Sequence, residues 1–375
     1  MRFAHVSDLH IGKRMKEKSL EEDQRHILGE IVRICIGEKV DGILIAGDIF
    51  DDGTSISNES TRMLDDFLTE LSDKGVAVFM ISGNHDSMDK VNYLSRMLIS
   101  RQVYISGAFS GKADRIPFSR DGQTVDVYLL PFIRPSYVRR EYPEEEIETY
   151  EDAVACVLAH SNPSNNKRIL VSHQMVYSGS TMPELSDSEF SHIGGLEAVS
   201  ASVFEGFDYV ALGHIHSPMN MGSERIRYCG APMKYALSRR ERDKSVTILD
   251  VGDAVSWYTV PLKPLRDVRF VTGTLEDIIA RGKADPCRED FIGAVVEGGA
   301  INAMSRLREV YPNVLALEFA DPGQTGQPAA VPTELGKLDA MEEFEKFFRS
   351  KTGEDLSESQ RKMVKELFEI NGVVL

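Results

Sequence analysis

Short apolar runs alternate with amphipathic stretches over the first 260 or so residues of the chain. Six of these runs, at 3–6, 42–46, 76–81, 127–131, 168–171 and 208–212, have the composition of strands buried on both faces. Helical spacing of apolar residues appears between several of them, as at 21–36 and 60–71. This alternation is typical of an α/β fold with a buried, layered sheet. Residues 245–250 and 255–260 are predicted to add two strands, joined as a hairpin.

A proline-containing junction at 261–264 separates this region from a second pattern. Strands are predicted at 269–271, 291–296 and 314–319, with helices at 275–281 and 300–310 between them. About 55 residues arranged in this way can form a small α+β module with a core of its own. We therefore expect one domain over 1–262 and a second over 263–320.

The remaining residues predict a linker followed by helices. Residues 321–333 contain three prolines and two glycines and lack hydrophobic periodicity, which is typical of a linker. Helical spacing relates Met341, Phe344, Phe347 and Phe348, and Ser357 with Gln360 forms a capping box before a second apolar face, Met363, Val364, Leu367 and Phe368. Two short helices over 334–375 must dock on something, either this chain or another protein.

Charge changes the picture only in part. The 43 basic residues against 59 acidic ones give a net charge of −16, which argues against a protein that coats nucleic acid non-specifically. The distribution is uneven, because residues 141–152 hold seven acids and no base, and residues 225–244 hold seven bases and two acids. This basic strip, 225–244, is either a contact for a polyanion or a solvated loop.

Composition also indicates the cellular compartment in which the protein is expected. The four cysteines are too far apart for a CxxC pair, a zinc finger or a disulfide framework, and this usage fits a reducing compartment. No apolar run approaches the roughly 20 residues that span a bilayer, and the first residues do not resemble a signal peptide. We expect a soluble cytoplasmic protein with no membrane partner.

Five of the apolar runs end in residues suited to holding a metal ion. Side chains after the carboxyl ends of parallel strands meet at one edge of a sheet, so these five clusters are expected to converge. Glycines at 47, 83 and 213 stand just before the polar residues, where the backbone must turn without a Cβ in the way. The candidate ligands are Asp8, His10, Asp48, Asn84, His173, His214 and His216. The other histidines, His5, His26, His160 and His192, lack this setting and are expected to be structural or solvent-facing.

The donor set favours two ions. Two carboxylates, one amide oxygen and four imidazoles exceed the four positions of a tetrahedral site, and Asp48 is the natural bridging ligand. Imidazole with oxygen donors suits Mn, Fe or Zn, and paired ions favour metal-assisted hydrolysis of a phosphoester. Because Asn84 and His85 are adjacent, we assign Asn84 to a metal and leave His85 to face the phosphate as a proton donor or charge stabiliser. Asp51 and Asp86 are expected to orient the ligands.

These motifs resemble the calcineurin-like metallophosphoesterases, and in particular the SbcD family. The matching segments are MRFAHVSDLHIGK at the start, AGDIFD at 46–51, SGNHDS at 82–87 and ALGHIHSP at 211–218. RIRYCGAPMKYALSRRERDKSVTILDV, PLKPLRDVRF and the terminal FEKFFRSKTGEDLSESQRKMVKELF extend the likeness over nearly the whole chain. One departure is Asp51, where some members of the wider family carry a second catalytic histidine.

The resemblance implies a manganese-dependent nuclease with a capping domain at 263–320 and a partner-binding helical region at 334–375. It implies one Mn²⁺ on Asp8, His10, Asp48 and His216, a second on Asp48, Asn84, His173 and His214, and His85 as the catalytic residue. Other divalent ions are possible. The implied activities are 3′–5′ exonuclease on duplex DNA ends and endonuclease on single strands or hairpins. The implied partners are DNA, an SbcC-type coiled-coil ATPase and a second copy of the chain, in double-strand-break repair at the nucleoid.

Two other functions fit parts of the sequence. A phosphatase or small-ester phosphodiesterase shares the site chemistry. A tether for DNA ends, with incidental cleavage, fits the capping module and terminal helices. The sequence does not fix cleavage polarity, the preferred DNA end, the metal used in the cell, the dimer surface, the role of Asp51, or whether the basic strip contacts DNA.

Overall fold

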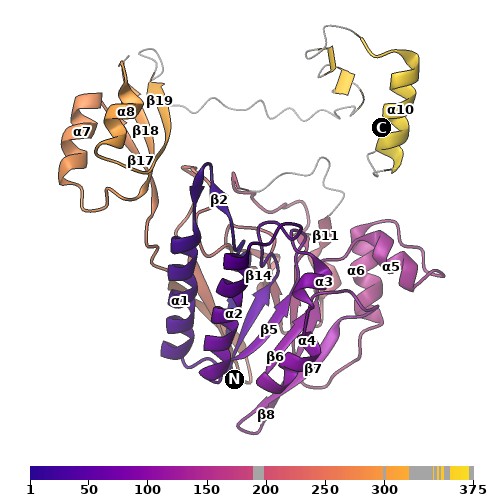
Figure 1. The fold of residues 1–375 in the computed structure, drawn as a ribbon. Coiled ribbons are helices and arrows are strands. Elements are labelled where there is room, and N and C mark those ends of the chain that lie inside the picture. Colours follow the sequence, from indigo (N-terminus) through magenta and orange to yellow (C-terminus); the bar gives the residue numbers. More distant parts are fainter. Residues whose placement is uncertain are drawn as a thin grey trace. The chain divides into compact units, whose positions relative to one another are not determined.

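The computed structural model describes residues 1–188, 198–298, 301–320 and 355–370, with 341, 344, 345, 348 and 349, and only the backbone over 365–370. The chain divides into two compact units, Met1–Ala320 and Asp321–Leu375. Figure 1 shows the elements of both units.

The first of two six-stranded sheets contains the amino-terminal strand. Its order is β16-β15-β1-β4-β5-β6, with β1, β4, β5 and β6 parallel and β15 antiparallel to β1. Helices α1 (Glu21–Gly37) and α2 (Asn58–Asp73) contact each other and pack on this sheet (Figure 1). The strands are β1 (Arg2–Val6), β4 (Gly42–Ala46), β5 (Ala77–Ile81), β6 (Val103–Ser106), β15 (Ser245–Val251) and β16 (Val255–Pro261).

The second sheet has the order β13-β14-β12-β9-β8-β7, with β8, β9, β12 and β14 parallel. Helices α5 (Pro135–Glu141) and α6 (Tyr150–Ala159) supply side chains to the core on one face of it. The strands are β7 (Asp114–Arg120), β8 (Gln123–Leu130), β9 (Lys167–Ser172), β12 (Tyr209–Leu212), β13 (Met219–Met221) and β14 (Ser223–Tyr228).

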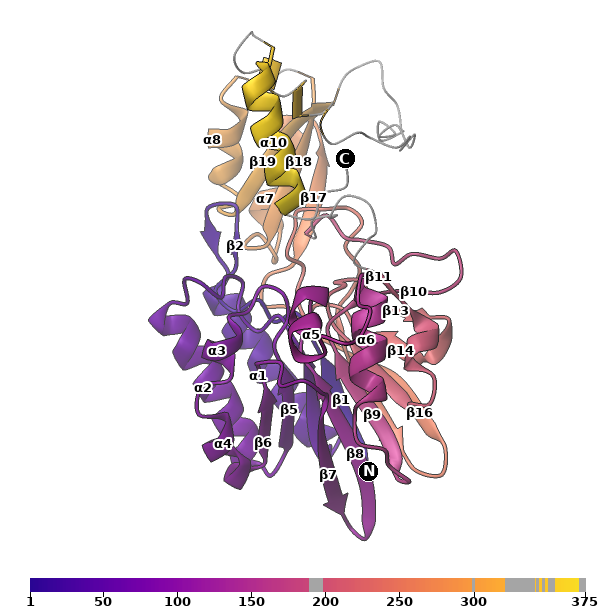
Figure 2. The same ribbon diagram turned by 90° about the vertical axis from the view of Figure 1, so that its right-hand side faces the viewer.

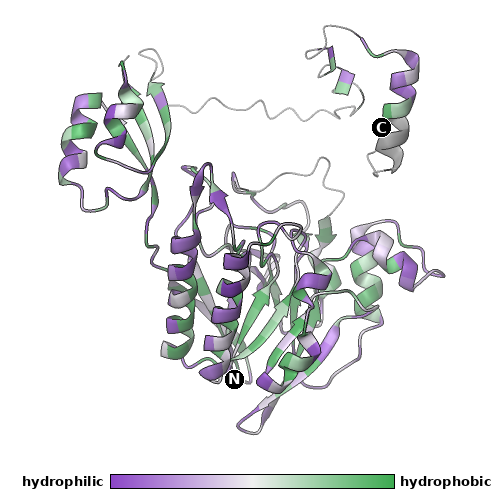
Figure 3. Ribbon diagram, in the orientation of Figure 1, coloured by the Kyte–Doolittle hydropathy of each residue, from purple (hydrophilic) through white to green (hydrophobic). Residues whose placement is uncertain are grey.

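The two sheets bury a shared apolar core between them. Phe3, Leu44 and Phe79 from the first sheet pack with residues such as Ile169 and Tyr209 from the second. Figure 3 shows the result, with strands mostly hydrophobic and helices carrying hydrophilic positions. The predicted layered α/β core is confirmed, and its strands form two six-stranded sheets.

Short elements connect these layers. They are β2 (Arg14–Met15), β3 (Lys18–Ser19), α3 (Met88–Val91), α4 (Ser95–Leu98), η1 (Ile99–Arg101), β10 (Met175–Tyr177), β11 (Ala198–Ser200) and η2 (Ala201–Phe204). In Figure 2, β2, β10 and β11 lie towards the upper end of the two sheets and α4 lies towards the opposite end.

A separate parallel sheet, β17-β18-β19, follows the proline junction. Its strands β17 (Val268–Gly273), β18 (Phe291–Glu297) and β19 (Val314–Ala320) share a core with α7 (Leu275–Ala284) and α8 (Ala303–Arg308). Helix α8 is shorter than the predicted helix at 300–310. Polar contacts join this module to the first sheet's region, because Arg266 donates to both carboxylate oxygens of Asp23 and Lys16 Nζ donates to the Leu315 carbonyl at 2.9 Å.

In the carboxyl-terminal unit, α10 runs from Glu358 to Ile370. The Ser357 N–H donates to Gln360 Oε1 at 2.9 Å, and the Gln360 N–H donates to Ser357 Oγ at 3.4 Å, so the predicted capping box forms. Met341, Phe344 and Phe348 are helical. The predicted linker at 321–333 and the rest of the first terminal helix lie outside the described residues. Among the helices that the structure describes, none is long and apolar enough to cross a membrane.

Candidate metal centre

The candidate ligands follow strands from both sheets. Strands β1, β4 and β5 run parallel in the first sheet, and β9 and β12 run parallel in the second. Their carboxyl ends therefore bring the five polar clusters to one edge of the sandwich, where the side chains contact one another across the two sheets.

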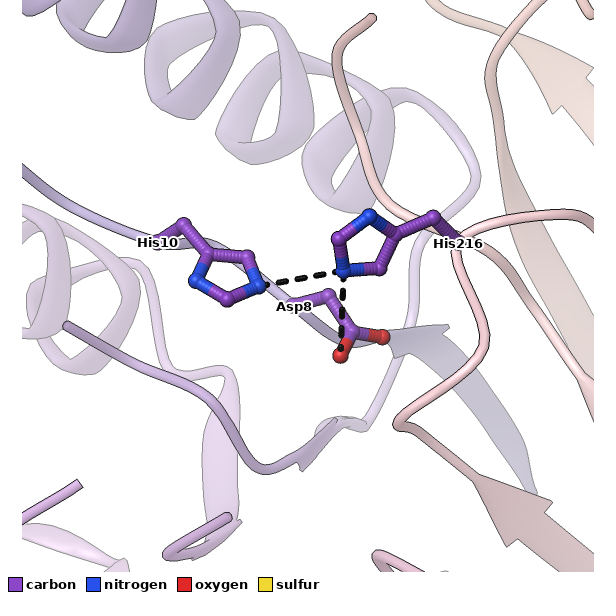
Figure 4. A group of neighbouring side chains, drawn as sticks. All are labelled: Asp8, His10 and His216. Carbon is purple, nitrogen blue, oxygen red and sulfur yellow. Dashed lines mark hydrogen bonds and ion pairs between the residues drawn. The ribbon is translucent and has the colours of Figure 1, made fainter. Parts of the chain in front are cut away.

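One group of side chains joins β1 to the loop after β12 (Figure 4). His10 Nε2 lies 3.1 Å from His216 Nε2, and His216 Nε2 lies 4.0 Å from Asp8 Oδ1. All three residues are buried. Asp48 Oδ2 lies 3.6 Å from His10 Nε2, which places the Asp48 carboxylate beside this group.

A second group lies on the other side of Asp48. Asn84 Oδ1 is 2.9 Å from His214 Nδ1 and 3.1 Å from His173 Nε2. Asp48 Oδ1 is 3.4 Å from the same His173 nitrogen. The two oxygens of Asp48 thus face two different groups, which is the arrangement a bridging carboxylate requires.

The chemistry of these groups fits divalent cations. Four imidazoles, one amide oxygen and two carboxylates meet here. Asp8 and Asp48 are buried, and paired buried carboxylates are costly unless a cation compensates them. His173 Nδ1 lies 2.7 Å from the Ala46 carbonyl oxygen, so Nδ1–H donates there and Nε2 is left to bind. Cys229 contacts the Ser7 hydroxyl with its Sγ at 3.1 Å, and burial raises the pKa of its thiol to about 12.

The two buried carboxyl groups differ in their pKa. Burial raises the pKa of Asp48, but the adjacent His173, His10 and His85 outweigh this effect and hold it well below its usual range. Burial, with the neighbouring Asp48 charge, raises the pKa of Asp8. The bridging position is therefore the more strongly anionic of the two.

The backbone is strained at four of the candidate ligands. The φ values are 54° at Asp8, 41° at His10, 51° at Asp48 and 92° at His214. Residues other than glycine seldom adopt these positive backbone angles. Hydrogen bonds hold two of these turns, because the His214 N–H donates to the Asp8 carboxylate and the His85 N–H donates to Asp48 Oδ1 at 3.0 Å. Strain of this kind concentrates at functional sites.

Two of the glycines have different roles. Gly47 has a φ of +86°, as expected for a sharp turn, and a Cβ there would lie 2.4 Å from His173 Nδ1. Gly83 does not have a positive φ. A Cβ at Gly83 would lie 2.1 Å from Asp48 Oδ1, so glycine is needed for close approach rather than for the turn that the sequence suggested.

His85 stands at the rim of the site, with 39% of its side chain exposed. Its Nδ1 lies 3.1 Å from the Asp51 carbonyl oxygen, and its Nε2 lies 4.0 Å from Asp48 Oδ2. Asp51 itself pairs with Lys13 Nζ at 2.6 Å and lies 3.4 Å from His10 Nδ1. Partial burial raises the pKa of Asp51, but His10 and Lys13 outweigh this effect and lower it to about 2. The Asp86 carboxylate accepts three backbone N–H groups, from Ile49, Phe50 and Gly83, and so orients the turns on both sides.

Sequence reasoning missed three side chains that support the site. Ser188 Oγ lies 2.7 Å from His216 Nδ1. The buried Tyr235 ring packs edge-on against His10 and His216, with its hydroxyl donating to the Leu9 carbonyl. Lys13 pairs with Asp51, as above. Nothing in the spacing of these residues separates them from ordinary loop positions.

The basic strip makes contacts within the protein. Arg239 stacks on Phe270 and pairs with Glu318 at 4.0 Å, in the small module. Lys244 donates to the His216 carbonyl at 3.2 Å. Further ion pairs or ring contacts involve Arg227 with Trp257, Lys234 with Asp267, Arg240 with Asp187, and Arg242 with Glu184. Lys244 therefore contacts the site, and Arg239 and Lys234 contact the small module or the residues just before it.

Of the histidines expected to be structural, His5 is buried and lies 3.0 Å from the Tyr209 hydroxyl. His26 contacts the Lys263 carbonyl, and His160 caps α6. His192 lies outside the described residues.

The two-sheet sandwich and the carboxylate, amide and imidazole cluster at its edge define a metallophosphoesterase. Residues 1–218 match the calcineurin-like phosphoesterase family model. Residues 262–352 match the family model described as the type 5 capsule protein repressor C-terminal domain, SbcD_C. The chain is also 33% identical to the SbcD subunit of nuclease SbcCD from Staphylococcus epidermidis strain ATCC 12228, over 98% of each chain. The chain belongs to the SbcD family of calcineurin-like phosphoesterases and is a metal-dependent phosphoesterase.

Solved structures of two proteins have a distant likeness. A dimetal phosphatase from Danio rerio is 14% identical with a TM-score of 0.40, covering 71% of this chain and 98% of that one. The phosphoesterase Yfce from E. coli is 12% identical with a TM-score of 0.30, and the match covers 70% of this chain and 100% of that one.

Proposed function

We propose that this chain is a manganese-dependent DNA nuclease that acts with a coiled-coil ATPase of the SbcC type in double-strand-break repair. The observation that carries the proposal is the meeting of the seven candidate ligands around Asp48, in a chain aligned from end to end with a nuclease subunit. The proposed activities are 3′–5′ exonuclease on duplex ends and endonuclease on single strands or hairpins.

Each group of side chains is proposed to hold one Mn²⁺. Asp8, His10 and His216 hold the first, Asn84, His173 and His214 hold the second, and Asp48 bridges them. When bound, paired divalent ions activate a water molecule and neutralise charge on the phosphodiester. Other divalent ions fit the same donors.

His85 is proposed to face the scissile phosphate. Its Nδ1–H donates to the Asp51 carbonyl, so Nε2 is directed towards the space beside Asp48. From there it can donate a proton to the leaving oxygen or stabilise negative charge. Its partial exposure leaves room for a polymeric substrate to reach it.

The remaining parts of the proposal concern assembly. Residues 1–262 are the nuclease domain, 263–320 the capping domain, 321–333 a linker and 334–375 the region that binds the ATPase. An exposed apolar segment, with Tyr93 73% and Met97 72% exposed, supports a homodimer through the nuclease domain. We place the complex in the cytoplasm, at the nucleoid.

The test compares two kinds of phosphodiester. The wild-type chain is incubated with Mn²⁺ and either an end-labelled hairpin or duplex DNA, or bis-p-nitrophenyl phosphate, with EDTA as a control. We expect Mn²⁺-dependent cleavage of DNA. Asp48→Asn removes the bridging charge and should bind fewer than two Mn²⁺ and lose at least about 100-fold in rate. Asp253→Asn, the same change in an exposed bend, should behave as wild type.

The other two functions predict different results in this assay. Hydrolysis of the chromogenic ester alone would indicate a small-ester phosphodiesterase. DNA binding without cleavage of either substrate would indicate a tether for DNA ends. Either outcome would contradict the nuclease proposal.

A further inference from the structure

A loop outside the five strand ends contacts the candidate metal centre. This 184–188 loop places Ser188 Oγ 2.7 Å from His216 Nδ1, and Ser186 Oγ lies 2.7 Å from the Ser188 hydroxyl. Ser186 is 7% exposed and His216 is 4% exposed, and Ser188 is half-buried. None of the sequence motifs includes this loop.

The contact determines which nitrogen of His216 is available. If Nδ1–H donates to the Ser188 hydroxyl, the Nε2 lone pair is directed towards His10 and Asp8. The hydrogen bond also fixes the rotation of the ring. Partners of this kind change metal affinity about 10–100-fold when they are removed.

The two candidate metal groups differ in how their histidines are oriented. His173 donates its Nδ1–H to a main-chain carbonyl, that of Ala46, inside the sandwich. His216 instead has its Nδ1 2.7 Å from a side-chain hydroxyl, that of Ser188 on the 184–188 loop. A change in the loop should therefore affect the Asp8–His10–His216 group and leave the other group unchanged.

Charged contacts hold the 184–188 loop against the basic strip. Glu184 pairs with Arg242 at 3.1 Å, and Asp187 pairs with Arg240 at 3.8 Å and accepts a hydrogen bond from Ser238. The four charged side chains are more than half exposed, so each ion pair is weak alone, but both pairs and the Ser238 hydrogen bond join the loop that carries Ser188 to the basic strip.

We propose that Ser188 is a positioning residue for His216, and that the Glu184–Arg242 and Asp187–Arg240 pairs hold it in place, so that this loop sets the affinity of one of the two metal ions. The inference depends on the proposed dimetal function. It assigns Arg240 and Arg242 to positioning the loop rather than to contacting a polyanion.

The first test measures Mn²⁺ binding to the full chain by isothermal titration calorimetry, with free Mn²⁺ counted by electron paramagnetic resonance. Ser188→Ala should weaken the binding of one of the two ions about 10-fold or more and leave the affinity for the other within about twofold of the wild-type value. Ser188→Thr keeps the hydroxyl and should restore binding. Ser161→Ala, which removes a hydroxyl bonded to backbone groups away from the site, should leave both affinities unchanged.

The second test exchanges the charges of one ion pair. Glu184→Arg should weaken the binding of the same ion several-fold. Glu184→Arg combined with Arg242→Glu should restore that binding. A merely structural role for the loop would lower both affinities together, along with the melting temperature in EDTA.

Three outcomes overturn the proposal. These are unchanged binding in Ser188→Ala, equal weakening of both ions, and no recovery in either Ser188→Thr or the charge-exchanged pair. A wild-type chain that binds fewer than two ions would instead contradict the proposed dimetal function itself, so the two failures are distinguishable.

Discussion

His85 is held differently from the buried histidines of the site. Its side chain is more than one-third exposed, and its backbone N–H, not its ring, makes the short contact with Asp48. The neighbouring Asn84 directs its amide oxygen towards His173 and His214 instead. Asn84 therefore faces the candidate ligands of one metal ion, whereas the adjacent His85 lies at the exposed rim of the site.

We expect His85→Ala to keep both metal ions and lose most of the rate, about 100-fold or more, because proton transfer by a positioned side chain contributes on that order. The backbone N–H bonded to Asp48 Oδ1 survives the substitution. Inductively coupled plasma mass spectrometry gives the metal content, and hairpin cleavage gives the rate. An emptied metal site would show that His85 is a ligand, contrary to the assignment.

How far sequence predicts this site depends on the residue. Asp8, Asp48 and the paired histidines were identifiable because each follows an apolar strand, and parallel strands share an edge. The positive φ angles at Asp8 and His214 could not be identified from the sequence, because nothing in the residue types marks a strained backbone. Ser188 was also missed, since its contact with His216 joins residues 28 positions apart through tertiary structure.

Polar side chains link the two sheets as well as the shared apolar core. His5 on β1 lies 3.0 Å from the Tyr209 hydroxyl on β12 and 3.2 Å from the Leu212 carbonyl. Arg227 on β14 donates to Thr247 Oγ1 on β15 and lies 3.8 Å above the Trp257 ring on β16. The relative position of the sheets, and with it the metal centre between their ends, is therefore fixed by specific contacts.

Burial lowers the pKa of His5 to about 3, with Arg227 adding to the effect. Because this is below the ordinary value of 6.5, the unfolded chain binds the proton first as pH falls. The stability from neutral His5 is complete above pH 6.5 and is lost between pH 6.5 and 3, at about 1.4 kcal/mol per pH unit. Urea unfolding in EDTA from about pH 7 to 5 should show this slope, and His5→Gln should flatten it; equal slopes in both proteins would refute the assignment.

Strand pairing is a part of the fold that the sequence pattern does not specify. The apolar runs marked individual strands, but periodicity does not state which strands are neighbours, and both sheets are buried on two faces. Strand β7 was missed because Pro117 and its charged residues do not resemble a central strand. β7 lies at an edge of the second sheet, where proline is tolerated.

The exposed segment over α4 and its flanks predicts the dimer surface. Tyr93, Leu94, Met97 and Ile99 are all at least 47% exposed. We expect a mass of twice 41.9 kDa by size-exclusion chromatography with light scattering, and Met97→Glu should shift it to the monomer because a charge is costly in a buried interface. Met182→Glu, at an exposed methionine elsewhere, is the control. A wild-type monomer, or a dimeric Met97→Glu, would rule out this surface.

At the scale of the molecule, contacts of the basic strip join the small module and the metal centre within Met1–Ala320. The basic strip reaches the module through Arg239 and Lys234, and it reaches the site through the Lys244 hydrogen bond to the His216 carbonyl. Residues Met1–Ala320 consequently form one compact unit, although sequence composition divides them at the proline junction. The terminal residues form a unit of their own.

This division predicts the effect of removing residues 334–375. In the sequence, Met363 belongs to the apolar face of an amphipathic helix, α10 in the structure, which is the kind of surface that docks in a groove of a partner protein. The shortened chain should fold, because the described residues of its four core clusters all precede residue 321. It should keep Mn²⁺-dependent cleavage and lose co-purification with the coiled-coil ATPase. Met363→Glu in the full chain should lose the ATPase in the same pull-down, with circular dichroism checking the fold. If the shortened chain unfolds, the terminal helices belong to its own core, because only lost intramolecular contacts would explain that result.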